Sequence, residues 1–442
     1  MLNYIWLALV LLAVAIGGWN DRLKDVTDGA FDGAKTAVTI ALGLIGVMAL
    51  WLGVMRLAER AGLVQRIARA LRPIMRRLFP DVPADHPAMG SMLMNMAANM
   101  LGLGNAATPL GLRAMRDLET LNPRPGIATN AMCTFLAINT SSVQLIPTTA
   151  IAILVAAGSH RPTAIVGTAL LATLCAASVA IISVKLLEKL PWFRVKTNES
   201  VRKTEPEAIT PAAAEEISLA EKKPVPLWRS MILVVLVMFF AVLFLRMVFP
   251  QLFNLPADAI TANQNTFVRC VNALSILAIP FLLSFFPLYA AVRGIKVYDE
   301  FVEGAKEGFG VILKIIPFLV TMLVAINMFK GAGGIDMLAR ALAPILGPLQ
   351  FPPDLLPIAL MRPLSGGATL ALFTDVVHRL GPDNIVSLMA ATVYGSTETT
   401  FYVAAVYFGS VGIKQTRHAI PAGLLADATG VIASVIICRA VL

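Results

Sequence analysis

Residues 28–74 read DGAFDGAKTAVTIALGLIGVMALWLGVMRLAERAGLVQRIARALRPI, and residues 299–345 repeat this segment at a constant offset of 271 positions. Fifteen of the 47 aligned positions are identical, with no gap, and they place Gly33 on Gly304 and Pro73 on Pro344. At ordinary amino-acid frequencies, chance would match about three or four. The chain therefore consists of two related halves, an organisation typical of secondary transporters.

The composition indicates that both halves lie in a lipid bilayer. The chain has 442 residues, of which 57% are hydrophobic and 14% are charged, whereas soluble domains carry about 25% charged residues. Several long stretches contain no Asp, Glu, Lys, Arg or His, among them residues 1–20, 36–55, 125–159 and 162–184. Because about 20 helical residues cross the hydrocarbon layer, we expect an all-α polytopic membrane protein. We interpret the net charge of +9 as basic loops facing anionic lipid, and we expect no nucleic-acid partner.

The distribution of basic residues predicts the topology. The Arg-rich loop at 66–77 and the basic loop at 113–124 both belong on the cytoplasmic side. They share that side only if residues 86–120 enter and leave the membrane on one face, as a re-entrant hairpin. With a cytoplasmic N-terminus, the helix at 230–249 then inverts the second half, whose own hairpin is expected near 354–379.

This topology divides the chain into four parts. Residues 190–228 are rich in Glu, Lys, Ala and Pro, a composition that cannot bury a core. The predicted parts are an N-terminal repeat at 1–189, a cytoplasmic linker at 190–228, an inverting helix with an outside loop at 229–269, and a C-terminal repeat at 270–442. We expect a multi-pass protein of the bacterial inner (cytoplasmic) membrane with two inverted repeats, each with a re-entrant hairpin and a broken transmembrane helix.

Each expected hairpin has a glycine-rich tip that could form part of a binding site. In the first tip, Thr108 is expected to cap a helix that begins at Pro109; in the second, Ser365 or Thr369 has that role. Helix N-termini near the midplane would attract an anion or a polar solute, although the glycines could instead serve close helix packing. The candidate residues are Asn105, Thr108, Arg362, Ser365, Gly366, Gly367 and Thr369.

Two polar breaks interrupt long apolar helices at related places in the two halves. Their hydroxyl, amide and carboxylate groups could bind a solute or an ion, or could form hydrogen bonds between helices. A charge at mid-membrane costs at least ~2.5 kcal/mol, so either Glu398 and Arg362 pair with each other or one of them faces the solute; Asp427 is a weaker candidate. The candidate residues in the breaks are Asn139, Thr140, Ser141, Ser142, Gln144, Ser396, Thr397, Glu398 and Thr399.

The sequence shows no sign of an enzyme. It contains no H-E-x-x-H, Walker A or G-x-S-x-G motif, and its Cys residues show no metal-binding spacing. We therefore expect no catalytic residue, no metal and no cofactor.

The tips and breaks also carry a family resemblance. NMAANMLGLGNAATPLGLRAM (95–115) and AINTSSVQLIPTT (137–149) resemble the spore maturation protein A family. MRPLSGGATLALFTD (361–375) and YGSTETTFYVAAVYFG (394–409) resemble the spore maturation protein B family. The chain looks like a fusion of the two, within the nucleoside recognition (Gate) domain superfamily, which is similar to concentrative nucleoside transporters. The resemblance implies a transporter fold with re-entrant hairpins and leaves the substrate open.

The leading hypothesis is a secondary transporter or binder of a small polar or anionic solute, such as a nucleoside, coupled to H⁺ or Na⁺. The alternative is a non-transporting membrane scaffold or a regulator of envelope assembly. A dry centre with Glu398 paired to Arg362 would favour the scaffold. The expected partners are a small-molecule solute and the lipid bilayer, and a homo-oligomer such as a dimer stays open.

Overall fold

The computed structural model describes residues 2–102, 104–193, 227–253, 265–334, 337, 340 and 351–442. These residues form helices, and their β-structure is limited to an isolated bridge between Ile127 and Gln415. In chain order the elements are α1 (Leu2–Trp19), α2 (Leu23–Arg60), α3 (Leu63–Leu78), α4 (Pro87–Met100), α5 (Gly104–Glu119), α6 (Asn130–Ser141), α7 (Thr148–Ala156), α8 (Ile165–Leu187), α9 (Leu227–Val248), η1 (Pro250–Phe253), α11 (Thr266–Val292), α12 (Val297–Gly331), η2 (Pro353–Leu355), α14 (Leu356–Met361), α15 (Gly366–Leu380), α16 (Ile385–Ser396), α17 (Thr400–Gly409) and α18 (Ala419–Val441).

Several of these helices are long and apolar enough to cross a membrane. Among the described residues they are α2, α8, Met231–Val248 of α9, α11 and α18. α9 buries only 6% of its apolar window inside the protein, as expected for a helix whose side chains face lipid. These helices confirm the expected all-helical, multi-pass architecture.

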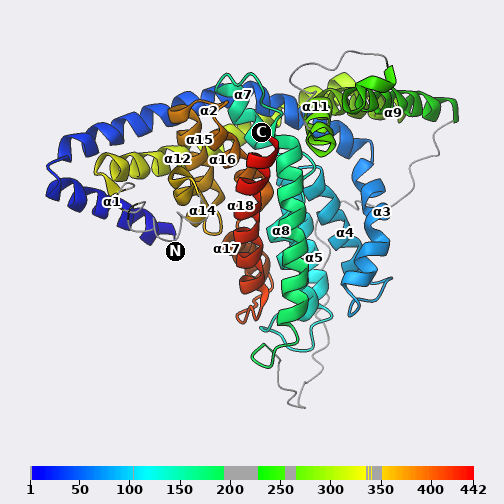
Figure 1. Ribbon diagram of the computed structural model, residues 1–442. Coiled ribbons are helices and arrows are strands. Elements are labelled where there is room, and N and C mark those ends of the chain that lie inside the picture. Colours follow the sequence, from blue (N-terminus) through cyan, green and yellow to red (C-terminus); the bar gives the residue numbers. More distant parts are fainter. Residues whose placement is uncertain are drawn as a thin grey trace.

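The two halves meet along α2 and α12, which form from the repeated segment (Figure 1). A Cβ added at Gly33 would lie 2.6 Å from the carbonyl oxygen of Leu323, and one at Gly304 would lie 2.7 Å from that of Leu52. At the offset of 271, Gly304 and Leu323 are the counterparts of Gly33 and Leu52. The two contacts are therefore equivalent, and they require α2 and α12 to run antiparallel.

A second related pair, α8 and α18, also packs side by side (Figure 1). Ala176 and Gly430 are each the twelfth residue of a 23-residue helix, and a Cβ at Gly430 would lie 3.6 Å from that of Ala176. Thr168, early in α8, and Cys438, late in α18, both form hydrogen bonds to Thr392. The pair therefore crosses near its midpoints and runs antiparallel.

Between these pairs, each half contributes a helical hairpin. α4 and α5 pack together through a turn at Leu101 and Gly102, where Gly102 has a φ of 74° that favours glycine. α14 and α15 form the shorter second hairpin. Ser365 caps α15 by accepting a hydrogen bond from the backbone N–H of Ala368 at 3.2 Å, as the sequence predicts.

Each half also contains a broken helix, again as expected. α6 ends at Ser141 and α7 begins at Thr148, whereas α16 ends at Ser396 and α17 begins at Thr400. The first break follows from Ser142, which has a φ of 29°. The second follows from Thr397, whose extended backbone cannot continue a helix.

Candidate functional site

The two helix breaks, more than 250 residues apart in the sequence, touch each other. The backbone N–H of Glu398 donates to the carbonyl oxygen of Thr140 at 2.6 Å. The Nε2 of Gln144 donates to the Oε1 of Glu398 at 3.2 Å. The tip of the α4–α5 hairpin joins them, because the N–H of Leu145 donates to the carbonyl oxygen of Met100 at 3.0 Å. Both breaks and one hairpin tip thus form a single site.

A pocket of about 150 Å³ lies at this junction. Its wall combines one carboxylate, two amides, two tyrosines and a threonine with apolar side chains, so hydrogen-bonding groups converge on a small volume. These polar groups come from both halves of the chain. The lining residues are Asn99, Ala107, Thr108, Asn139, Glu398, Tyr402, Val403, Val406 and Tyr407.

A hydrogen-bonded network holds one wall of the pocket in place. The Oδ1 of Asn139 accepts from the Nδ2 of Asn99 at 2.9 Å and from the hydroxyl of Tyr407 at 3.4 Å. The Nδ2 of Asn139 donates to the carbonyl oxygen of Phe135 at 2.9 Å, one turn back in α6. The Nδ2 of Asn95 donates to the hydroxyl of Tyr407 at 3.3 Å. Asn139 therefore has a fixed amide orientation, and its Oδ1 is already occupied before any solute binds.

Glu398 and Arg362 do not form a salt bridge in the described part of the chain. Arg362 is 2% exposed; its guanidinium donates to the carbonyl oxygen of Tyr394 at 2.9 Å and lies 5.1 Å from the centre of that ring. Glu398 is half-buried and lines the pocket. The two residues are therefore not paired: Arg362 binds the backbone and ring of Tyr394, and Glu398 lines the pocket.

At the first tip, one expectation is wrong. α5 begins at Gly104, and Pro109 lies inside it, so Thr108 is not an N-cap. Pro109 is the sixth residue of α5, past the first turn, so it removes a backbone hydrogen bond of the helix. Contact with α4 offsets this loss, because the Nδ2 of Asn95 donates to the carbonyl oxygen of Ala107 in the added turn at 2.7 Å. Thr108 instead lines the pocket, while the side chain of Asn105 lies outside the described part of the structure.

The other hydroxyls of the first break support the backbone. Thr140 and Ser141 donate to the carbonyl oxygens of Leu136 and Ile138 in their own helix. Thr173 of α8 donates to the carbonyl oxygens of Ser141 and Ser142, at 2.9 and 3.1 Å. These bonds satisfy carbonyls that the helix end leaves free. The Oγ of Ser142 is buried without a hydrogen-bond partner.

The second tip lies against the second break and not in the pocket. The N–H of Phe401 donates to the carbonyl oxygen of Pro363 at 3.0 Å. A Cβ at Gly366 would lie 3.1 Å from the Oγ1 of Thr399, so this glycine allows a close approach. Thr369 donates to the carbonyl oxygen of Ser365 at 2.7 Å. Gly367 lies in the first turn of α15.

Two threonines of the second break have unsatisfied hydroxyls. Ser396 donates to the carbonyl oxygen of Val393 at 2.9 Å. Thr397 and Thr399, each 2% exposed, have buried Oγ1 atoms without a hydrogen-bond partner. Of the residues selected from the sequence, the pocket therefore brings together Thr108, Asn139 and Glu398.

Sequence reasoning missed four residues at the site. Asn99 and Tyr407 belong to the network, Tyr402 lines the pocket, and Asn95 supports Tyr407. Asn95 and Asn99 are one helical turn apart, so their shared face could have been recognised in the string NMAANM. The tyrosines carry no such signal, because aromatic residues are common in membrane helices for other reasons.

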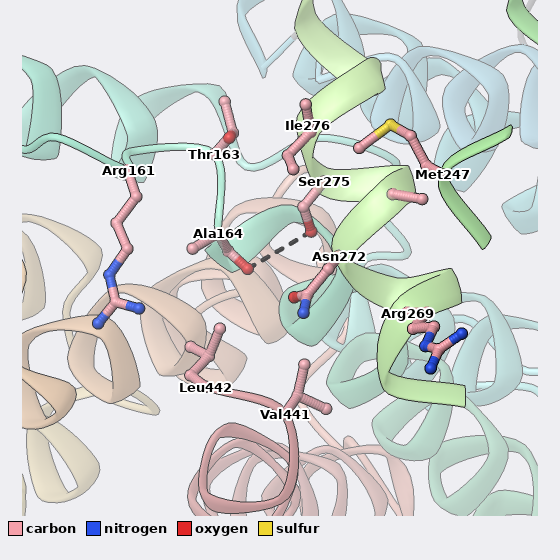
Figure 2. A pocket seen from close by; sticks show the side chains of 11 residues that line it. Arg161, Thr163, Ala164, Met247, Arg269, Asn272, Ser275, Ile276, Val441 and Leu442 are labelled. Atoms are coloured by element: carbon pink, nitrogen blue, oxygen red, sulfur yellow. Dashed lines mark hydrogen bonds between the residues drawn. The ribbon is translucent and has the colours of Figure 1, made fainter. Parts of the chain in front are cut away.

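A larger pocket of about 320 Å³ lies elsewhere, between the start of α8, α11 and the end of α18 (Figure 2). Figure 2 shows Arg161 and Arg269 on opposite sides of it, with Ser275 donating to the carbonyl oxygen of Ala164 at 3.5 Å. It contains neither a helix break nor a hairpin tip. We therefore base the function on the smaller pocket, where polar groups of both halves converge.

The fold and site define a class: a multi-pass α-helical membrane protein with a polar pocket between broken helices. The Gate family, described as nucleoside recognition, matches residues 41–157 and 312–414. The two matches begin 271 positions apart, which is the offset of the internal repeat. The chain belongs to this family and carries its domain in two copies.

Two curated relatives cover roughly the two halves. Spore maturation protein A of Bacillus subtilis (strain 168) is 49% identical over 182 residues, which are 41% of this chain and 93% of that protein. Spore maturation protein B of the same organism is 44% identical over 170 residues, which are 38% of this chain and 96% of that protein. The chain is therefore homologous to both, in agreement with the resemblance described above.

Proposed function

We propose that the protein is a secondary transporter of a small polar solute, which binds in the pocket beside Glu398. The observation that carries the proposal is the convergence of a hairpin tip and two helix breaks on one polar cavity. In secondary transporters, discontinuous helices form substrate sites near the membrane midplane. A chain that served only as a scaffold would have no reason to keep a partly buried carboxylate facing a cavity.

The packing of the repeats supports the inverted topology that this function needs. Helix α2 runs antiparallel to its counterpart α12, and α8 runs antiparallel to its counterpart α18. The two halves are therefore related by an approximate two-fold axis perpendicular to these helices. If these helices span the bilayer, the halves have opposite orientations, as in transporters with inverted repeats. We further propose that both hairpins are re-entrant, that the N-terminus is cytoplasmic, and that the protein lies in the inner membrane.

The pocket restricts the solute that it can hold. A cavity of 150 Å³ accommodates a molecule about the size of benzene, and this pocket has that volume. A carboxylate in the wall favours a neutral solute with hydrogen-bond donors over an anion. A ring of the size of a nucleobase satisfies both the limit on volume and the preference for hydrogen-bond donors. A whole nucleoside is larger and would need the pocket to open toward the α4–α5 hairpin.

Uptake into proteoliposomes tests the proposal. The purified chain is reconstituted and radiolabelled uracil and uridine are supplied as probes, with an imposed Na⁺ or proton gradient. We expect gradient-driven uptake of at least one probe. Glu398→Gln removes a hydrogen bond to a charged group, which is worth about 1.5–3 kcal/mol, so binding of that probe should weaken by about 10- to 100-fold.

Glu119→Gln is the matched control. Glu119 lies at the end of the α4–α5 hairpin and accepts a hydrogen bond from Asn122 outside the pocket, so this variant should transport like the parent. If neither probe is taken up under either gradient, and neither stabilises the protein against heat, the scaffold alternative becomes the better account. Equal uptake by the Glu398→Gln variant and the parent would remove Glu398 from the site.

A further inference from the structure

A second buried carboxylate, Asp427 of α18, contacts the second break and does not line the pocket. It is 2% exposed, and its Oδ2 accepts a hydrogen bond from the hydroxyl of Thr400 at 2.6 Å. Its Oδ1 is buried without a hydrogen-bond partner, and no salt bridge to it exists among the described residues. An unpaired carboxylate oxygen in this position is costly unless it binds something.

Comparison of the two halves shows that a carboxylate is not needed to support a break. Thr173 of α8 and Asp427 of α18 are each the ninth residue of their helices. Thr173 binds the first break through two backbone carbonyls and is fully satisfied. Asp427 occupies the equivalent place at the second break, where it adds a negative charge and an unused oxygen. The two halves therefore differ at this position: Thr173 has a hydroxyl that supports the backbone, whereas Asp427 has a carboxylate oxygen that could bind a ligand.

Two hydroxyl groups of the second break act on the carboxylate of Asp427. The hydroxyl of Thr397 interacts with the carboxylate of Asp427, although neither that hydroxyl nor the Oδ1 of Asp427 has a partner with ordinary hydrogen-bond geometry. Thr400 supplies a third oxygen. The charged groups that act on Asp427 are Arg362 from the second tip and Glu398 from the break.

We propose that Asp427, Thr397 and Thr400 bind a Na⁺ ion. Carboxylate, hydroxyl and carbonyl oxygens are the ligands of hard cations, and unwound backbone in transporters coordinates Na⁺. The inference rests on the proposed function, because it assigns the coupling ion to this site. Thr397 and Thr400 flank Glu398 in the sequence, so binding of the ion would hold the backbone of Thr397 to Thr400 in the conformation that places Glu398 in the pocket wall.

Direct binding of ²²Na⁺ to the purified full-length chain, without any solute, tests the site. A scintillation proximity assay measures saturable binding, with N-methyl-D-glucamine maintaining the ionic strength. We expect saturable binding by the parent and about 10- to 100-fold weaker binding or worse by Asp427→Asn, since even the loss of groups that only support a metal ligand costs this much. Thr397→Val and Thr400→Val keep the carboxylate and should each weaken binding less.

Thr173→Val is the matched control, because it removes the equivalent hydroxyl at the first break. It should lower thermal stability and leave the affinity for ²²Na⁺ unchanged. If Asp427→Asn does not elute as a folded protein in gel filtration, the two threonine variants carry the test. The proposal is overturned if the parent binds no ²²Na⁺ or if all three site variants bind Na⁺ like the parent. It is also overturned if the melting temperature of the parent changes with pH but does not rise when Na⁺ replaces N-methyl-D-glucamine.

The assay separates this inference from the proposed function. Uptake of a probe driven by a proton gradient, with no ²²Na⁺ binding, would reject the Na⁺ site and retain the transporter. Saturable ²²Na⁺ binding with no uptake and no stabilisation by either probe would retain the ion site and reject the solute pocket.

Discussion

The substitution Gly33→Ala tests the contact that joins the two halves. The new Cβ would lie 2.6 Å from the carbonyl oxygen of Leu323, 2.8 Å from its carbonyl carbon and 3.0 Å from the Cα of Val324. All three atoms belong to the backbone of α12, so no side chain can move aside. The optimal separation of such atoms is about 3.5–4.0 Å, and the helices must therefore separate. Overpacking of this kind costs about 1–3 kcal/mol.

Gly46→Ala in the same helix isolates this cost. No heavy atom lies within 4 Å of a Cβ built at Gly46. Both substitutions gain the same helix propensity, about 1 kcal/mol, so the difference between the two variants is the cost of the contact alone. At an unfolding entropy of about 2.1 cal/mol/K per residue, a chain of 442 residues shifts by about 1 °C per kcal/mol.

Thermal unfolding in detergent, followed by tryptophan fluorescence, measures that difference. We expect Gly33→Ala to melt about 1–3 °C below Gly46→Ala. Gly304→Ala, at the equivalent contact with Leu52, should behave in the same way. Equal melting temperatures for Gly33→Ala and Gly46→Ala would refute the close antiparallel contact and, with it, the structural evidence that the two halves are equivalent here.

Two further outcomes are expected. Gly111→Ala would place a Cβ against the hydroxyl of Tyr407. Because the Tyr407 side chain can move, the stability measured by heat denaturation should change by less than ~1 kcal/mol, but binding of the uracil probe should weaken, as it should in Tyr407→Phe, which removes the same hydroxyl. Normal binding of the probe by both variants would contradict the pocket network. At the α15–α16 loop, burial acts to raise the pKa of Asp383, but hydrogen bonds from the Ser159 hydroxyl and two backbone N–H groups bring that pKa below its usual range. A depressed folded pKa stabilises the protein above the unfolded pKa of about 3.9, and this contribution is lost as the pH falls through the folded value. Ser159→Ala should therefore lower the melting temperature at pH 7 and have a progressively smaller effect below about pH 4, whereas an equal effect at both pH values would exclude this linkage.

Much of the fold was predictable from local patterns. The gap-free repeat identified α2 and α12 as equivalent, and the polar strings at 139–144 and 396–399 marked the helix breaks. Ser365 was recognisable as a cap because one residue with a known stereochemical role decides the helix start there. The same reasoning was wrong at Thr108, where packing in the α4–α5 hairpin extends the helix through Pro109. Local preference decided the first case and tertiary contact the second.

The candidate site was less predictable, because its geometry depends on contacts between the halves. The sequence selected Glu398 and Arg362 but could not decide whether they pair. The answer depends on whether the Arg362 guanidinium donates to Glu398 or to the carbonyl oxygen of Tyr394, and in the structure it donates to Tyr394. Tyr402 and Tyr407 enter the pocket only because α17 packs against α5 and α6. No periodicity within α17 distinguishes a tyrosine that faces a cavity from one that faces lipid.

The backbone contact between α2 and α12 also limits how the molecule can move. Sliding α2 along α12 by one helical turn, toward the N-terminus of α2, would bring Ala37 in place of Gly33 toward the carbonyl of Leu323, so shear in this direction is resisted. We therefore expect α2 and α12 to keep a fixed relative position. A movement that opens the pocket to a solute is then expected between helices that touch through side chains and not through backbone atoms. The α4–α5 hairpin and α17 meet this condition through Thr108, Tyr402 and Val406. The gate is thus expected in these two elements, while α2 and α12 keep their relative position.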